Sequence, residues 1–449
     1  MTRLQKKQPL QKHINFKNYF DEKNIFYRHQ LCRFFNSKAQ VTANTELKGL
    51  INQSFGYFPK IKEVENTMET ARQRLEIAKN NMPIVDANAS YNFVEPKIVL
   101  PLEINGKVQD FQFAPVHNFN ANVGASYTLF DFGRLKANIE KSKSDIKYAE
   151  HNTDYAKSQL ANQVANVYYN IIYFQKGIVI EDSVIAYLND NKQVVESKLR
   201  NGDAIKLDLL SIQSQIDAEE NKKIDLQNYL QKQLNLLKYT TGNDNTAGSA
   251  FDFEIPLKAV AEALGEAQIN NPEYLLANDR VKQSQNDIAI ARLGTKPSVN
   301  IGASTGFKNG YVPDVNVMKF NYAAGLSLKL PIYDGNRTKQ QVKLSETVLT
   351  QNKLAIETLN SNYKRDIQQA LIDIQSNQER INNTKGQIEQ AQTAETLAAS
   401  RFKNGVGTNL EITNASTNVA RAQFSKLQYE YQLCVAKVEL VRLLGYKYW

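Results

Sequence analysis

The sequence has few of the residues that build reactive or metal-binding sites. Its 449 residues include only two cysteines and four histidines, and these form neither a CxxC pair nor a set of ligands at zinc-site spacing. The motifs HExxH and GxGxxG and the phosphate-binding P-loop are also absent. We therefore expect no metal, no cofactor and no enzyme activity.

Long apolar runs and blocks of one charge are lacking too. The longest apolar run, YYNIIYF at 168–174, already contains an asparagine and falls far short of the ~20 residues of a transmembrane helix. Basic residues exceed acidic ones by nine, but beyond roughly the first 30 residues the two signs are interspersed, as on a solvated mixed-charge surface. We expect no nucleic-acid partner.

The N-terminus is unusual. Residues 1–40 are basic and aromatic but lack the apolar core of a secretory signal. The stretch FFNSKAQVTAN at 34–44 nevertheless resembles the end of a signal peptide, with small residues at Ser37 and Ala39. Either residues 1–43 are an anomalous leader that replaces a signal peptide, or the protein is cytosolic.

Several landmarks recur at one fixed spacing. KLRNGDAIKLDL at 198–209 and RFKNGVGTNLEI at 401–412 place Gly202 and Gly405 203 residues apart (405 minus 202). The same offset relates TLFDFGR at 128–134 to PIYDGNR at 331–337, and Gly242 to Gly445. Three landmarks in one ungapped frame predict an internal duplication, with repeats at 44–256 and 257–449.

Four segments alternate between apolar and polar residues, as half-buried antiparallel strands do. They are 85–93, 120–130, 298–307 and 321–332. A soluble sandwich and a membrane barrel with a wet lumen both produce this alternation. The asparagine, serine and glycine of the polar face favour the lumen, and we expect the lumen to include Asn88, Asn92, Asn122 and Ser126.

Each strand pair leads into a proline-free stretch, 134–200 or 337–401, that predicts a helix of about 100 Å. A seven-residue stripe indicates coiled-coil packing; it comprises Ile139, Ile146, Thr153, Leu160, Val167 and Phe174, and in the second repeat Val342, Leu349, Ile356, Tyr363 and Ala370. Apolar periodicity resumes at 207–237 and 410–444. The Asn-Gly pairs between these stretches predict sharp reversals, so each repeat would form a long antiparallel hairpin.

In this order the elements resemble the outer membrane efflux protein family, the TolC-like outer membrane factors, over about residues 44–449. The resemblance rests on the duplicated turns quoted above, on Phe58-Pro59 and Asn271-Pro272 between short helices, and on Met82-Pro83 and Lys296-Pro297 before the strands. It implies a membrane α+β fold in the cell outer membrane. Four strands per chain would close a twelve-stranded β-barrel in a homotrimer, which a coiled-coil helical tunnel would continue into the periplasm.

The resemblance also implies the function and the partners. The protein would be the exit duct of a tripartite efflux system and would passively conduct substrates delivered by a periplasmic adaptor and an inner-membrane pump. The residues expected to contact the adaptor are those of the hairpin tips: Gly202, Asp203, Ala204, Gly405, Val406 and Gly407.

A periplasmic gate is implied just beyond the tips. It would include Glu411, matched in the first repeat by Asp208, with Asn414 in place of a second acid and Phe402 in place of a tyrosine found in well-known members. One acidic ring and fewer closing hydrogen bonds would then remain. The alternative for both acids is that they complement a helix N-terminus.

Two other functions compete with the efflux duct. One is the outer membrane duct of a type I protein secretion system, and the other is a cytosolic coiled-coil scaffold. The scaffold leaves the four alternating strands unexplained.

Overall fold

The computed structural model describes residues 41–104 and 106–449. The expected leader, 1–43, therefore lies outside the described residues except for its last three. Of these, Thr42 pairs with Glu254 through two backbone hydrogen bonds of 3.0 Å. Within the described ranges, no helix has the length and apolar character needed to cross a membrane.

The two halves of the chain carry the same order of helices and strands, except that the first half has an additional hairpin, β2–β3. The first half contains α2 (Thr45–Tyr57), α3 (Pro59–Lys79), β1 (Ile84–Phe93), β2 (Val99–Ile104), β3 (Lys107–Gln112), β4 (His117–Phe130), α4 (Arg134–Asn201) and α5 (Lys206–Thr241). The second contains α6 (Val260–Asn270), α7 (Pro272–Arg292), β5 (Ser298–Lys308), β6 (Lys319–Lys329), α8 (Arg337–Lys403) and α9 (Asn409–Leu444). The predicted long hairpins, α4–α5 and α8–α9, are therefore confirmed.

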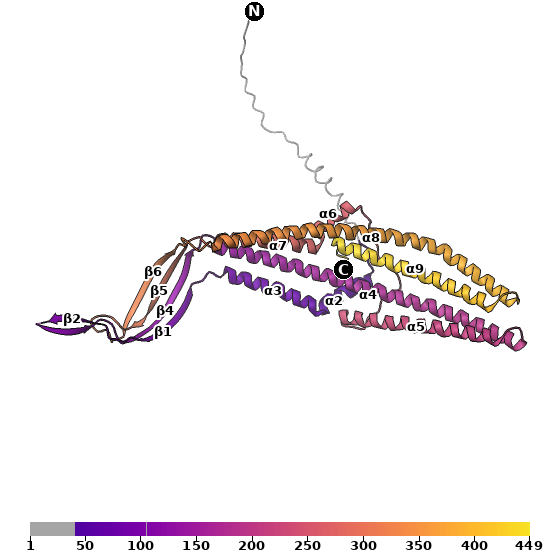
Figure 1. Cartoon of the computed structure of the whole chain (residues 1–449), viewed down its shortest axis with the longest axis horizontal. Coiled ribbons are helices and arrows are strands. Elements are labelled where there is room, and N and C mark those ends of the chain that lie inside the picture. Colours follow the sequence, from indigo (N-terminus) through magenta and orange to yellow (C-terminus); the bar gives the residue numbers. More distant parts are fainter. Residues whose placement is uncertain (1–40, 105) are drawn as a thin grey trace, which may run out of the picture. The chain divides into compact units, whose positions relative to one another are not determined.

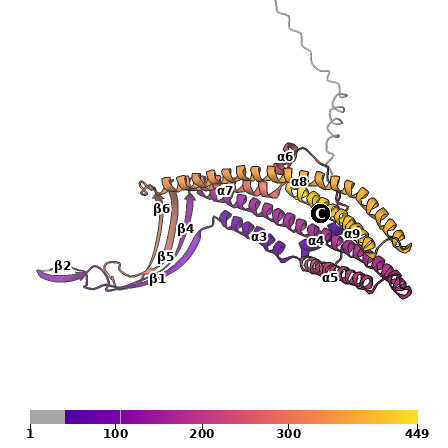
Figure 2. The same ribbon diagram turned by 45° about the vertical axis from the view of Figure 1, so that its right-hand side comes forward.

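Within residues 41–449, the strands and the hairpin turns lie at opposite ends of the long helices (Figure 1). Helices α3 and α5 lie along successive parts of α4, while α7 and α9 do the same along α8, as Figure 2 also shows. Helix α4 also packs against α7 and α9 and so joins the two halves. The four long helices thus form one layer of antiparallel pairs.

The main core lies midway along α4. There Tyr168, Tyr169 and Ile172 are fully buried against the C-terminal part of α9 and the strand-like segment around Phe253. The predicted heptad stripe faces this interior, since Thr153, Leu160, Val167, Tyr363 and Ala370 are all buried. Its residues nearest the strands, such as Ile139 and Ile146, are only half-buried.

The four predicted strands form one antiparallel sheet in the order β1-β4-β5-β6. Its register aligns the alternation of all four: Ala87, Val123 and Thr305 lie side by side on one face, and Asn88, Asn122 and Gly306 on the other. The predicted separation of an apolar and a polar face is therefore present across the sheet. Among residues 41–104 and 106–449, both outer strands, β1 and β6, have one unpaired edge.

Two details of the strands differ from the sequence prediction. A further hairpin, β2–β3, occupies the connection between β1 and β4 and forms a separate two-stranded sheet. In addition, β6 ends at Lys329, because Pro331 cannot donate a backbone hydrogen bond to a neighbouring strand. Leu330 and Ile332, predicted as strand residues, therefore lie in the loop before α8.

Candidate functional site

The candidate site is the pair of turns at the far end of the two long hairpins. Gly202 and Gly405 have φ angles of 83° and 79°, a conformation that glycine adopts without the steric cost borne by other residues. The turns are closed by backbone hydrogen bonds, from Asp203 N–H to the Lys198 carbonyl (2.8 Å) and from Val406 N–H to the Arg401 carbonyl (3.0 Å). The predicted reversals are confirmed at both glycines.

The two tips contact each other within one chain. The Lys198 ammonium donates to the backbone carbonyl of Phe402 at 2.7 Å and lies 4.6 Å from the centre of its ring. A second hydrogen bond runs from the second hairpin to the first: the buried Asn409 side-chain amide donates to the backbone carbonyl of Asp208 at 3.2 Å. A small apolar cluster, including Val195, Ile212, Phe402 and Ile412, fills the space between the hairpins.

Lys198 and Asn409 were not singled out from the sequence. The only signal for Lys198 is the repeated basic residue three positions before Asn-Gly, which is Arg401 in the second copy. The structure gives these two basic residues different partners. Lys198 reaches across to the other hairpin, whereas Arg401 stays on its own hairpin.

The acidic gate candidates both lie at helix starts and have different partners. The Glu411 carboxylate pairs with the Arg401 guanidinium (Nε to Oε2, 3.2 Å), and Arg401 also donates to the Val406 carbonyl at 3.2 Å. Asp208 instead accepts the backbone N–H of Ile205 at 3.1 Å and so caps the start of α5. Glu411 is the more exposed of the two acids.

The other two gate candidates differ in burial. Asn414 is exposed on α9, one turn after Glu411. Phe402 is only 7 % exposed and belongs to the tip core. Phe402 therefore fastens the two hairpins together within the chain, through packing and through its carbonyl.

Large apolar side chains are exposed around both turns, a feature that was not expected from the sequence. They are Ile205, Leu207, Leu210, Val406 and Leu410, each more than half exposed. An exposed apolar group of this size, rimmed by charges, commonly marks a surface for another protein. The predicted tip residues Asp203, Ala204 and Gly407 lie among them.

The predicted lumen residues share the polar face of the sheet. Asn88 and Asn122 are directly paired, and Asn92 pairs with Asn118 four residues further along the β1–β4 ladder. Side-chain hydrogen bonds run along this face, from Asn88 to Asp86 (2.8 Å) and from Thr128 to Asn300 (2.9 Å). Ser126 lies on the same face but opposite Ile84, at the end next to the helices.

One stretch matches the letters of a hydrolase motif. Residues 302–306, GASTG, fit GxSxG, but Ser304 lies within β5, where it pairs with Gly124 and Ala323. The motif requires a tight turn between a strand and a helix, so Ser304 is not placed as a nucleophile. Among the described residues, no group of three or more His, Cys, Asp or Glu side chains could hold a metal ion.

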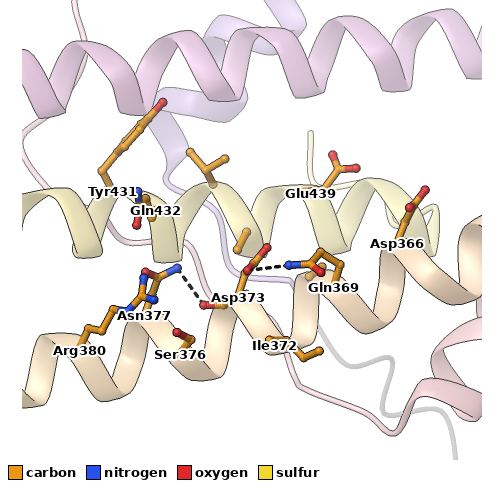
Figure 3. Close-up of a pocket in the computed structure, with 13 residues that line it drawn as sticks. Asp366, Gln369, Ile372, Asp373, Ser376, Asn377, Arg380, Tyr431, Gln432 and Glu439 are labelled. Carbon is orange, nitrogen blue, oxygen red and sulfur yellow. Dashed lines mark hydrogen bonds between the residues drawn. The ribbon is translucent and has the colours of Figure 1, made fainter.

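A groove of about 740 Å³ runs between α8 and α9 (Figure 3). Its polar side chains form hydrogen bonds mainly within their own helix. Gln369 donates to the Asp373 carboxylate (3.0 Å), and Asn377 donates to the Asp373 backbone carbonyl (2.8 Å). Arg380 lies over the ring of Tyr429. These partners are those of a solvated seam between helices rather than of a reaction site.

Gly407 is expected to be sensitive to any side chain. A Cβ there would lie 2.8 Å from the Phe402 nitrogen and 3.0 Å from the Arg401 carbonyl carbon, both backbone atoms. We predict that Gly407→Ala lowers the free energy of unfolding by about 1–3 kcal/mol, measured by thermal or denaturant unfolding. Gly386→Ala is the control, because that position in α8 is open and alanine favours a helix by about 1 kcal/mol. Equal effects of the two substitutions would contradict the tip geometry.

Comparison with known proteins gives consistent matches over most of the chain. The family model described as "Outer membrane efflux protein" matches twice, at residues 59–243 and 263–446. Among curated proteins, Nodulation protein T of Rhizobium leguminosarum bv. trifolii is 21% identical over 394 residues, which cover 84% of this chain and 83% of that protein. Outer membrane protein TolC of Escherichia coli is 21% identical over 433 residues, which cover 88% of this chain and 85% of that protein.

Solved structures share the fold. The structure of CusC, described in terms of folding and transmembrane channel formation, aligns with a TM-score of 0.76 at 17% identity, covering 92% of this chain and 95% of that chain. At this identity the likeness is evidence of fold only. It extends over both long hairpins and the sheet, because so little of either chain is left out.

Proposed function

Because this chain belongs to the outer membrane efflux protein family, we propose that it is the outer-membrane exit duct of a tripartite efflux system. In this proposal the duct conducts substrates passively from a periplasmic adaptor and an inner-membrane pump to the exterior. The observation that carries the proposal is the arrangement of a two-faced sheet and a pair of exposed apolar tips at opposite ends of long helices. The sheet suits a bilayer and the tips suit a protein partner.

The sheet supports assembly into a homotrimer. Four strands are too few to close a barrel, and β1 and β6 each leave one edge unpaired in the part of the chain that the structure describes. Open edges are not tolerated in lipid, since every backbone polar group there needs a partner. Pairing of β1 with β6 of the next copy would close a barrel of twelve strands, with Val123 facing lipid and Asn88, Asn92, Asn122 and Ser126 lining the lumen.

The tips support a gate and an adaptor contact. We propose that Glu411, near Asn414, forms the acidic ring of the periplasmic gate. The hydrogen bonds of Lys198 to Phe402 and of Asn409 to Asp208 would hold the two hairpin tips together beside this ring. The adaptor would bind the tip residues 202–204 and 405–407 together with their exposed apolar neighbours. We also propose the division into repeats at 44–256 and 257–449, each of which contains one of the two family matches.

The oligomeric state tests this proposal. We expect native mass spectrometry of the protein from detergent-solubilised outer membranes to give a trimer that contains no other polypeptide. Three copies of the four-stranded sheet would supply the twelve strands of the proposed barrel and pair every edge. A folded monomer that is stable in detergent-free buffer would contradict the proposal.

A further inference from the structure

Two carboxylates are buried where α4, α5 and α9 meet, away from the tips. Glu181 of α4 and Glu219 of α5 are each only 3 % exposed. One turn before Glu181, Gly177 allows two neighbouring helices to approach α4 closely. A Cβ at Gly177 would lie 3.3 Å from Phe424 of α9 and 3.5 Å from Leu226 of α5. Leu226 and Phe424 line the same cavity as the two carboxylates.

There is too little positive charge around Glu181 and Glu219 to neutralise both carboxylates. Glu219 accepts hydrogen bonds from Gln215 (2.7 Å) and from Lys222 (2.6 Å). The Glu181 oxygen Oε2 is buried and has no hydrogen-bond partner among the described residues. Both carboxylates line a cavity of about 440 Å³. An ionised carboxylate without a partner is strongly disfavoured in such a place and takes up a proton instead.

The other charged groups facing this cavity do not supply the missing charge in this structure. They are Lys222 and Asp225 of α5 and Arg421 of α9. Lys222 is paired with Glu219, and Asp225 adds a further negative charge. Arg421 is exposed and forms no ion pair within 4.0 Å among the described residues.

We infer that Glu181 and Glu219 form a proton-binding site in the wall of the helical region, in which one proton shared by the pair supplies the missing positive charge. The inference does not depend on the proposed function. Burial, and then the negative charge of Glu219, raise the pKa of Glu181 to about 7. This pKa lies above the usual carboxyl value, so the stability that Glu181 contributes is fully present below about pH 4.5. This contribution is lost as the pH rises through about 7.

Thermal unfolding of the full-length protein in detergent, followed between about pH 5 and pH 8, tests the site. We expect the midpoint of the wild type to fall with rising pH more steeply than that of Glu181→Gln. The difference in slope should correspond to uptake of up to about one proton on folding. Glu220→Gln, an exposed neighbour on α5, is the matched control and should follow the wild type. If Glu181→Gln fails to fold, Glu219→Gln serves as the second variant, with the same expectation.

Infrared spectroscopy of the folded protein adds a readout that a purely structural role would not change. A protonated-carboxyl band should be present in the wild type near neutral pH and should be lost in Glu181→Gln. Parallel pH profiles for the two proteins would overturn the inference. A variant less stable at every pH would mean that Arg421 neutralises Glu181. If added calcium restores the wild type at high pH but not the variant, the site binds a metal cation instead.

Discussion

Replacing Val123 by arginine is expected to lower the stability of the assembled protein by about 2–4 kcal/mol, if Val123 lies near the middle of the bilayer. Val123 is on the apolar face of the sheet, between Ala87 of β1 and Thr305 of β5, and its side chain is about half exposed in the single chain. In the proposed barrel the exposed part of this side chain faces lipid. The guanidinium of an arginine at this position would lose its hydration there. The measurement is unfolding by denaturant in lipid, together with the fraction of trimer in outer membranes.

The adjacent residue provides the matched control. Asn122 precedes Val123 in the same strand but lies on the opposite face, between Asn88 and Gly306. We expect Asn122→Arg to be tolerated because the side chain would extend into water. The reverse order of effects would mean that the polar face meets lipid and the apolar face lines the lumen.

Replacing Glu411 by glutamine is expected to reduce the preference of the channel for cations by roughly fivefold, equivalent to about 1 kcal/mol. Three copies of Glu411 around a threefold axis would form a ring of negative charge, and such rings favour cations in pores. Here each carboxylate is partly neutralised by Arg401 at 3.2 Å. Arg401→Gln should therefore change selectivity in the opposite direction.

Asp208 is the control for the ring. Its carboxylate accepts the backbone N–H of Ile205 at the start of α5, and Asp208→Asn keeps a side-chain oxygen that can accept this bond while removing the charge. We expect a smaller change in selectivity than for Glu411→Gln, measured as reversal potentials in a salt gradient. If Glu411→Gln and Arg401→Gln leave the reversal potential unchanged, the constriction lies elsewhere along the helices.

The strands and long helices could be predicted because each has a regular period along the sequence. The alternation over about ten residues and the seven-residue stripe can both be recognised in the sequence alone. Neither requires knowledge of which residues are neighbours in space. The hairpin β2–β3 was missed because Pro101 interrupts its first strand, and a proline argues against a strand in most settings.

The contacts of the candidate site could be predicted only in part. The positions of Gly202 and Gly405 follow from local turn chemistry, and Glu411 follows from its spacing to the glycine. The contact between Lys198 and Phe402 joins residues 204 apart in the sequence, and no local pattern signals it. Glu181 and Glu219 resemble ordinary surface acids of a charged helix until α5 and α9 pack against α4.

Conduction through the assembled protein tests the account most directly. Purified trimers in a planar lipid bilayer should give discrete, cation-selective current steps that are small in the wild type. The steps should increase when Lys198→Met removes the link to the Phe402 carbonyl, because the two tips then separate more readily. Folded trimers that insert into the bilayer but carry no current, with Lys198 intact or replaced, would contradict the proposal that this protein is a duct.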